Sequence, residues 1–180
     1  MNTRLALLAP VLTAAALAGC ASPPMFKQDT LPAAVQVPAG NRVAMETVGV
    51  GEITYECKAK AGTADAFEWV FVGPKAALND RSGKTVGSYF GPPATWAALD
   101  GSKLTATQLA VAPGGTGNIP LQLVKANPAM GEGAMSGVSY IQRVATRGGV
   151  APAAACAAAK AGARQIVAYQ ADYIFWKPAM

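Results

Sequence analysis

Short stretches in which apolar and polar residues alternate follow one another along most of this chain. Between Ile53 and Lys58 every second residue is apolar, and Cys57 lies on the apolar face. Between Phe67 and Phe71 three aromatic side chains occupy alternate positions. Because successive side chains of a strand point to opposite faces of a sheet, this period predicts half-buried β-strands.

The spacing of the remaining runs predicts a chain built mainly from strands. Further strands are expected around Ala76 and Val86 and over 104–111, 119–125, 138–144 and 165–176. The segments Asn79–Gly83 and Asp100–Gly101 have the residues that hairpin connections need. The sequence therefore predicts a mainly β fold, a single antiparallel β-sandwich or a small β-barrel, and the pattern favours neither over the other.

One segment departs from the strand period. Residues 152–160 are mostly alanine, open with Pro152 and are followed by Gly162. Alanine is the best helix former, and proline is tolerated in the first turn of a helix. We expect one short helix over about 152–161, which would present Cys156.

The start of the chain has the features of an export signal. Met1–Arg4 carries one positive charge, Leu5–Ala18 is an apolar stretch too short to span a bilayer, and Leu17–Cys20 resembles the lipobox of bacterial lipoproteins. We expect residues 1–19 to be a signal peptide and Cys20 to carry the lipid. An ordinary secretory signal with a cysteine near its cleavage site is the alternative.

This interpretation divides the chain into three parts. Residues 20–40 hold four prolines and little periodicity, which is typical of a flexible tether between lipid and domain. Residues 41–180 are then a single β-rich domain. Ala21 and Ser22 stand where an aspartate would disfavour transfer to the outer membrane, so we expect an exported protein anchored there and facing the periplasm.

The cysteine count supports a disulfide. The chain has three cysteines, and assigning Cys20 to lipid leaves Cys57 and Cys156. Disulfides persist in oxidising compartments outside the cytoplasm, so we expect these two to be bonded. Two separate buried thiols are the alternative.

Charge and composition exclude several functions. The 15 basic and 10 acidic side chains are scattered and not interleaved with aromatic residues, so no nucleic-acid surface is expected. The chain contains no histidine, which excludes Ser-His-Asp catalysis and His-ligated zinc or haem. We expect neither a metal nor a cofactor.

Carboxylates are the residues left for catalysis. An acid and base pair from this set would suit a hydrolase of envelope carbohydrate. Asp100 sits in a turn, where aspartate has a structural reason to occur, while Asp172 interrupts an aromatic strand. A structural hydrogen bond is the other interpretation of Asp172.

A group of aromatic residues suggests a binding surface. Tyr89, Phe90 and Trp96 flank a Gly-Pro-Pro turn and would form a platform for a sugar ring or a peptide, with Asp100 and Asp172 completing a candidate binding patch. The alternative is that these rings belong to the core.

Several motifs, in order, resemble the family known as domain of unknown function 3455, which is found in secreted proteins. The matching stretches are 55–57, 67–71, 83–87, 95–96, 100–103, 119–120, 140–143, 148–152 with Cys156, and 171–173. The resemblance covers about Val48 to Trp176 and implies no activity.

These observations favour a non-enzymatic envelope lipoprotein over an enzyme. Its partners would be the membrane, through Cys20, and an envelope protein or glycan. A barrel that holds a small apolar ligand and the carboxylate hydrolase are the two alternatives.

Overall fold

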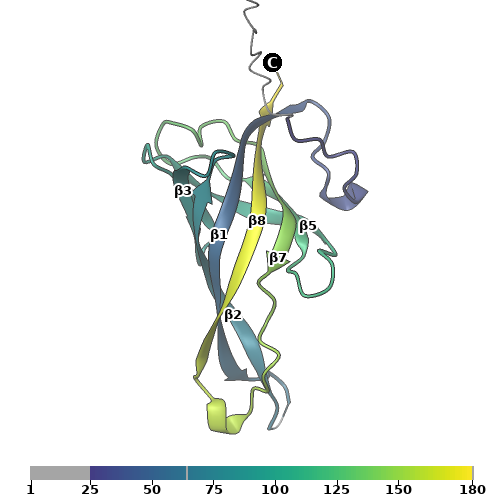
Figure 1. The fold of residues 1–180 in the computed structure, drawn as a ribbon, viewed down its shortest axis with the longest axis vertical. Helices are drawn as coiled ribbons and strands as arrows, with labels where there is room; N and C mark the ends of the chain where they lie inside the picture. Colours follow the sequence, from purple (N-terminus) through teal and green to yellow (C-terminus); the bar gives the residue numbers. More distant parts are fainter. Residues whose placement is uncertain (1–24, 64, 180) are drawn as a thin grey trace, which may run out of the picture.

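The computed structural model describes residues 25–63 and 65–179, so the predicted signal peptide and Cys20 lie outside the described residues. Eight antiparallel strands, each paired with the next in sequence, form a closed barrel in which the last strand pairs with the first (Figure 1). The strands are β1 Asn41–Ala59, β2 Phe67–Asn79, β3 Thr85–Phe90, β4 Thr95–Ala98, β5 Lys103–Ala112, β6 Leu121–Ala126, β7 Tyr140–Gly148 and β8 Arg164–Pro178. The mainly β prediction is confirmed, and of its two architectures the barrel is present.

The period-2 pattern gives the strands their inner and outer faces. In β1, Ile53, Tyr55 and Cys57 are buried, and the polar residues between them are only partly covered. The predicted hairpin turn at Asn79–Gly83 joins β2 to β3, and the Asp80 side chain accepts hydrogen bonds from the N–H groups of Ser82 and Lys84. The aspartate therefore closes the turn through its backbone contacts.

The sheet has a hydrophobic core on each of its faces. The inner core contains most of the large buried side chains, among them Tyr55, Leu78, Tyr89, Trp96, Leu104, Ile141, Tyr169, Tyr173 and Phe175. Along β8, Ile174 and Trp176 alternate with the inner residues and belong to the second core, on the outer face. A strand that is apolar on both faces needs cover on both.

The segment before β1 supplies that outer cover. Val35, in a short 3-10 turn η1 (Ala33–Val35), and Val37 are buried in the outer core, and the ring of Phe26 packs edge-on against Trp176. Gln28 and the Val35 carbonyl both accept hydrogen bonds from the Gln142 amide. The sequence predicted a flexible tether here, but residues 26–37 form a strap that is part of the folded domain. The strap is the purple segment at the upper right of Figure 1.

Strands of unequal length give the barrel a protruding end. β1, β2 and β8 continue below the other strands in Figure 1, and β3 and β4 are short. The connection from β7 to β8 runs down along this extension and returns through a 3-10 turn, η2 (Ala158–Lys160).

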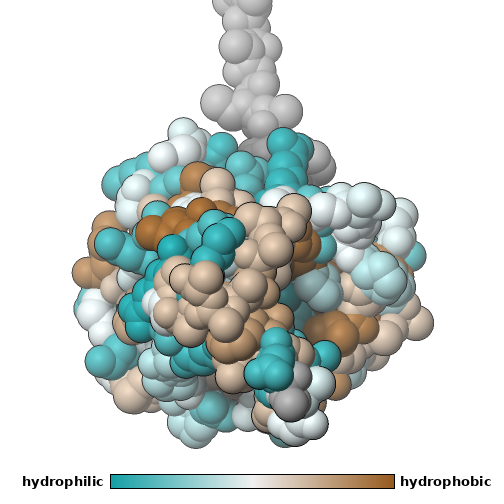
Figure 2. Space-filling view, turned by 90° about the horizontal axis from the view of Figure 1, so that it is seen from below, coloured by the Kyte–Doolittle hydropathy of each residue, from teal (hydrophilic) through white to brown (hydrophobic). Residues whose placement is uncertain are grey.

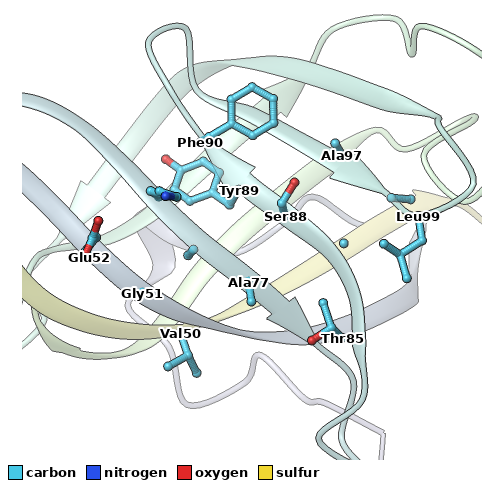
Figure 3. Close-up of a pocket in the computed structure, with 14 residues that line it drawn as sticks. Val50, Gly51, Glu52, Ala77, Thr85, Ser88, Tyr89, Phe90, Ala97 and Leu99 are labelled. Carbon is cyan, nitrogen blue, oxygen red and sulfur yellow. The ribbon is translucent and has the colours of Figure 1, made fainter.

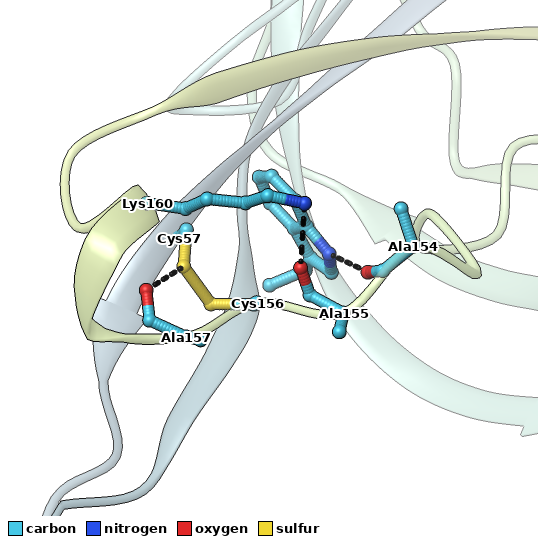
Figure 4. The surroundings of a disulfide bond; sticks show 7 residues. Cys57, Ala154, Ala155, Cys156, Ala157 and Lys160 are labelled. Carbon is cyan, nitrogen blue, oxygen red and sulfur yellow. Dashed lines mark hydrogen bonds between the residues drawn. A yellow bond between two sulfur atoms is a disulfide. The ribbon is translucent and has the colours of Figure 1, made fainter.

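The helix predicted over about 152–161 is wrong, since only η2 is helical in that stretch. A helix of this length is marginal in water without packing to support it. Cys156 is instead bonded to Cys57, with Cα atoms 5.6 Å apart, and the Ala154 carbonyl accepts a hydrogen bond from the Trp69 indole (Figure 4). These two contacts hold the chain in an extended path, and the disulfide prediction is confirmed.

Candidate functional site

A groove lies on the outer face of β1 to β4. Its floor consists of small side chains, because Ala77 pairs with Ser88 and Ser88 with Ala97 across neighbouring strands. The residues that alternate with them, including Tyr89 and Trp96, point into the barrel. The register thus brings three small outward side chains into one row.

Larger apolar side chains border this floor. Phe90 is 43% exposed, Val50 46% and Leu99 72%. Figure 3 shows Ser88 and Ala97 lying between Phe90 and Leu99, with Val50 on the far side of Ala77. The groove has a volume of about 810 Å³, which is within the range of small-molecule sites.

One end of the groove is charged. Glu52 and Lys75 are opposite each other in the register of β1 and β2, and both line the groove. The salt bridges found among residues 25–63 and 65–179 do not include either side chain. Both charges are therefore available to a bound molecule.

The aromatic residues of the predicted patch do not form one surface. Trp96 is 2% exposed and Tyr89 is 6% exposed, and their rings stack inside the barrel. Phe90, the next residue of β3, points outward. The platform predicted from these three rings is thus wrong, because strand alternation separates Phe90 from the other two.

Asp100 lies in the turn between β4 and β5 and has a structural role. Its carboxylate accepts hydrogen bonds from the N–H and Oγ of Ser102 and from the N–H of Ala134, at 2.9, 2.6 and 2.7 Å. The Ser102 hydroxyl and then the Ala134 N–H lower the pKa of Asp100 below its ordinary value. A carboxyl held in its ionised form in this way is poorly suited to be a general acid.

Asp172 is on the outer surface of β8, away from Asp100. Arg81, in the β2–β3 turn, contacts Asp172 at 2.7 Å and Glu46 of β1 at 2.8 Å. Glu46 also accepts a hydrogen bond from the N–H of Phe26, at 2.7 Å. Asp172 therefore belongs to an ionic network that fixes the start of the strap, and the structure does not join it with Asp100 or the aromatic rings in one patch.

Comparison with known proteins gives a single result. A family model described as "Protein of unknown function (DUF3455)" matches residues 38–177. The chain belongs to this family. No curated protein and no solved structure matches it. Family membership confirms the resemblance seen in the sequence, and the family's description assigns no function.

The interior of this DUF3455 domain contains a polar cluster that the sequence did not reveal. The hydroxyls of Tyr169 and Tyr173 are 3.3 Å apart, and Arg143 lies opposite Tyr173 in the register of β7 and β8. The pKa values of Tyr89, Tyr169 and Tyr173 are raised above the ordinary value, chiefly because these side chains are buried. The positive charge of Arg143 offsets part of this increase. The sequence does contain a signal for this cluster. Arg143 follows Ile141 by two residues, so both side chains lie on the inner face of β7.

Arg143 has a backbone partner at the barrel opening. Its Nε and Nη2 donate hydrogen bonds to the Pro120 carbonyl at 3.1 and 3.0 Å. Large aromatic side chains, among them Tyr89, Trp96 and Phe175, make up much of the inner core beside this contact. The alternative of a barrel with a ligand inside gains no support from this packing.

Within the described residues, no group of three or more acidic or cysteine side chains is placed to hold a metal ion. In the same part of the chain, no helix is long and apolar enough to cross a membrane.

Proposed function

We propose that this DUF3455 protein is a non-enzymatic binding module of the bacterial cell envelope and that its outer groove holds the acyl chain of an envelope lipid. The observation that carries the proposal is the groove itself, with its floor of small side chains and its apolar borders. Burial of apolar surface is the main source of affinity that such a groove offers.

The closed barrel favours an acyl chain over a peptide segment. The backbone groups of β1 to β4 that face one another are already paired in the sheet, so the groove offers a peptide few backbone partners. A peptide lying there would leave polar backbone groups unpaired, which is costly. An acyl chain has no such groups.

The charged end of the groove fits the head of a lipid. Lys75 and Glu52 together present one positive and one negative charge. A head group that also carries both signs would find a partner for each. A zwitterionic phospholipid with one acyl chain is therefore the probe of choice.

Lipid attachment at Cys20 is the second part of the proposal. It is supported by the apolar stretch Leu5–Ala18 and by Leu17–Cys20, which resembles a lipobox. More than one acyl chain on a single residue would hold the protein at a membrane. Replacing Cys20 by alanine should move the protein from the membrane fraction to the soluble fraction, and a variant that stays in the membrane fraction would contradict this part.

Binding in the groove is tested separately. Full-length protein is titrated with a fluorescent analogue of lysophosphatidylethanolamine below its micelle concentration. Ala97→Phe should fill the floor and weaken binding at least tenfold. Thr107→Phe, which adds a ring at an exposed position of β5 outside the groove, should bind like the wild type.

Two results would overturn the groove proposal. Wild-type protein that does not bind the probe would remove it outright. Equal losses in Ala97→Phe and Thr107→Phe would show that binding does not depend on the groove.

A further inference from the structure

The lower part of β2 is an open sheet edge. β2 pairs with β1 down to Phe67, but it pairs with β3 only over Lys75–Asn79. At Gly73 the chain is covered, because a Cβ there would collide with the Gly91 carbonyl. Within residues 25–63 and 65–179, the backbone of 67–71 has no hydrogen-bond partner besides β1.

This edge lacks most of the features that protect edge strands. Its sequence is Phe-Glu-Trp-Val-Phe, with Glu68 as the one charged residue, and its pairing with β1 is regular from Phe67 to Phe71, where a register shift follows. Phe71 is 53% exposed. Proteins usually block such edges with lysine, proline or a bulge, and an unblocked apolar edge is a template for another strand.

Among the described residues, the connection between β7 and β8 does not pair with this edge. It crosses the inner face of the extension, where Cys156 bonds to Cys57 and Ala154 contacts the Trp69 side chain. The backbone of this connection makes no hydrogen bond to the β2 backbone within the described residues. Figure 2 views this end of the molecule and shows a broad brown and tan area across its centre.

We infer that the edge 67–71 pairs antiparallel with the same edge of a second copy of this chain. The segment is complementary to itself when Trp69 lies on the two-fold axis, because Phe67 then faces Phe71 and Glu68 faces Val70. No carboxylate lies directly opposite another, and the aromatic side chains meet on one face of the joined sheet. Aromatic cross-strand pairs stabilise antiparallel sheets, and a two-fold contact of this kind closes as a dimer.

Charge placed at Val70 tests this register. Val70→Glu would put a carboxylate opposite Glu68 of the second copy, twice in each dimer. Val70→Lys would put an ammonium group there instead. In sedimentation equilibrium of the full chain in a density-matched detergent, the wild type should dimerise, Val70→Glu should dimerise at least tenfold more weakly, and Val70→Lys at least as strongly as the wild type.

A second measurement needs no substitution. Val70 is opposite Glu56 within its own chain, so thermal unfolding must show that both variants fold. Hydrogen exchange of the wild type at low and high concentration then reports on the contact directly. The amides of 67–71 that face the free edge should exchange more slowly when the protein is concentrated.

Three outcomes would overturn the inference. The first is a wild type that remains monomeric at all concentrations. The second is an equal change of association in Val70→Glu and Val70→Lys. A dimer without concentration-dependent protection in 67–71 would place its contact elsewhere. An edge that instead pairs with a peptide from another protein would also give a monomer when the chain is pure.

Discussion

The rings of Tyr89 and Trp96 stack inside the barrel with their centroids 4.7 Å apart. The two residues are directly opposite each other in the register of β3 and β4. Their neighbours Ser88 and Ala97 are also opposite each other and form part of the groove floor outside. The same pair of strands therefore builds both the inner core and the groove, so the stacked rings support the site from within the barrel, and Tyr89 is also among the residues that line the groove.

Shortening Trp96 should destabilise the domain strongly. Trp96→Ala removes a buried ring and is expected to cost about 3–5 kcal/mol in the free energy of unfolding. Trp96→Phe should cost less, because the buried indole N–H has no hydrogen-bond partner among the described residues. Urea denaturation of both variants measures the difference. Leu99→Ala, at an exposed position, is the control and should change stability by no more than about 0.5 kcal/mol.

Removing the disulfide should also lower stability. Cys57 and Cys156 are 99 residues apart in sequence, and closing a loop of this size stabilises a domain by up to about 4.7 kcal/mol, usually less. The double variant Cys57→Ala/Cys156→Ala should lose about 2–5 kcal/mol in urea denaturation. Wild-type protein unfolded in the presence of a reductant should lose a similar amount. An unchanged midpoint in the double variant would contradict this expectation.

The strap should contribute to the stability of the barrel. Val35 is fully buried against the outer face, so Val35→Ala is expected to cost roughly 1–3 kcal/mol. Ala34→Ser changes an exposed neighbour in the same turn and should have little effect. If both variants unfold at the wild-type urea concentration, the strap is not part of the cooperative unit.

Acid should remove the contribution of Asp100. A carboxyl whose pKa is lower in the folded chain than in the unfolded chain adds stability above the unfolded pKa, and this stability is lost as the pH falls through the folded pKa. The hydrogen bonds from Ser102 and Ala134 lower the pKa of Asp100. Asp100→Asn should therefore lower the melting temperature at about pH 7, and its difference from the wild type should shrink toward about pH 3.

Asp29→Asn is the matched control for this comparison. Asp29 is exposed. Its melting temperature should follow that of the wild type across the pH range. If the difference in melting temperature between Asp100→Asn and the wild type stays constant with pH, the effect comes from the altered side-chain geometry and not from the lost charge.

The parts of the fold that depend on local chemistry could be predicted from the sequence. The alternation around Ile53 gives a strand, and the turn at Asn79–Gly83 gives a hairpin. Both depend on contacts between residues that are close in sequence. The disulfide was predictable because few cysteines leave few ways to pair them. Barrel closure was not, since it depends on the pairing of β1 with β8, at opposite ends of the domain.

The features that could not be predicted share one physical cause. Contacts between residues far apart in sequence override the local preference of a segment. The alanine-rich segment favours a helix by itself, but the bond from Cys156 to Cys57 holds it extended. The groove floor consists of Ala77, Ser88 and Ala97, which are unremarkable in sequence and meet through register alone. The sequence did contain a signal for the strap. Ile174 and Trp176 make the outer face of β8 apolar, and an apolar face needs a covering segment.

The strap also limits how far the barrel can move from its anchor. A flexible segment from Cys20 to residue 40 would reach about 70 Å at full extension, at roughly 3.5 Å per residue. With Phe26 held by Glu46 and Trp176, only the residues between Cys20 and Phe26 remain to span the distance, and they reach about 20 Å. If Cys20 carries lipid as proposed, the domain works within one protein diameter of the membrane surface. Any partner must then come to the membrane to meet it.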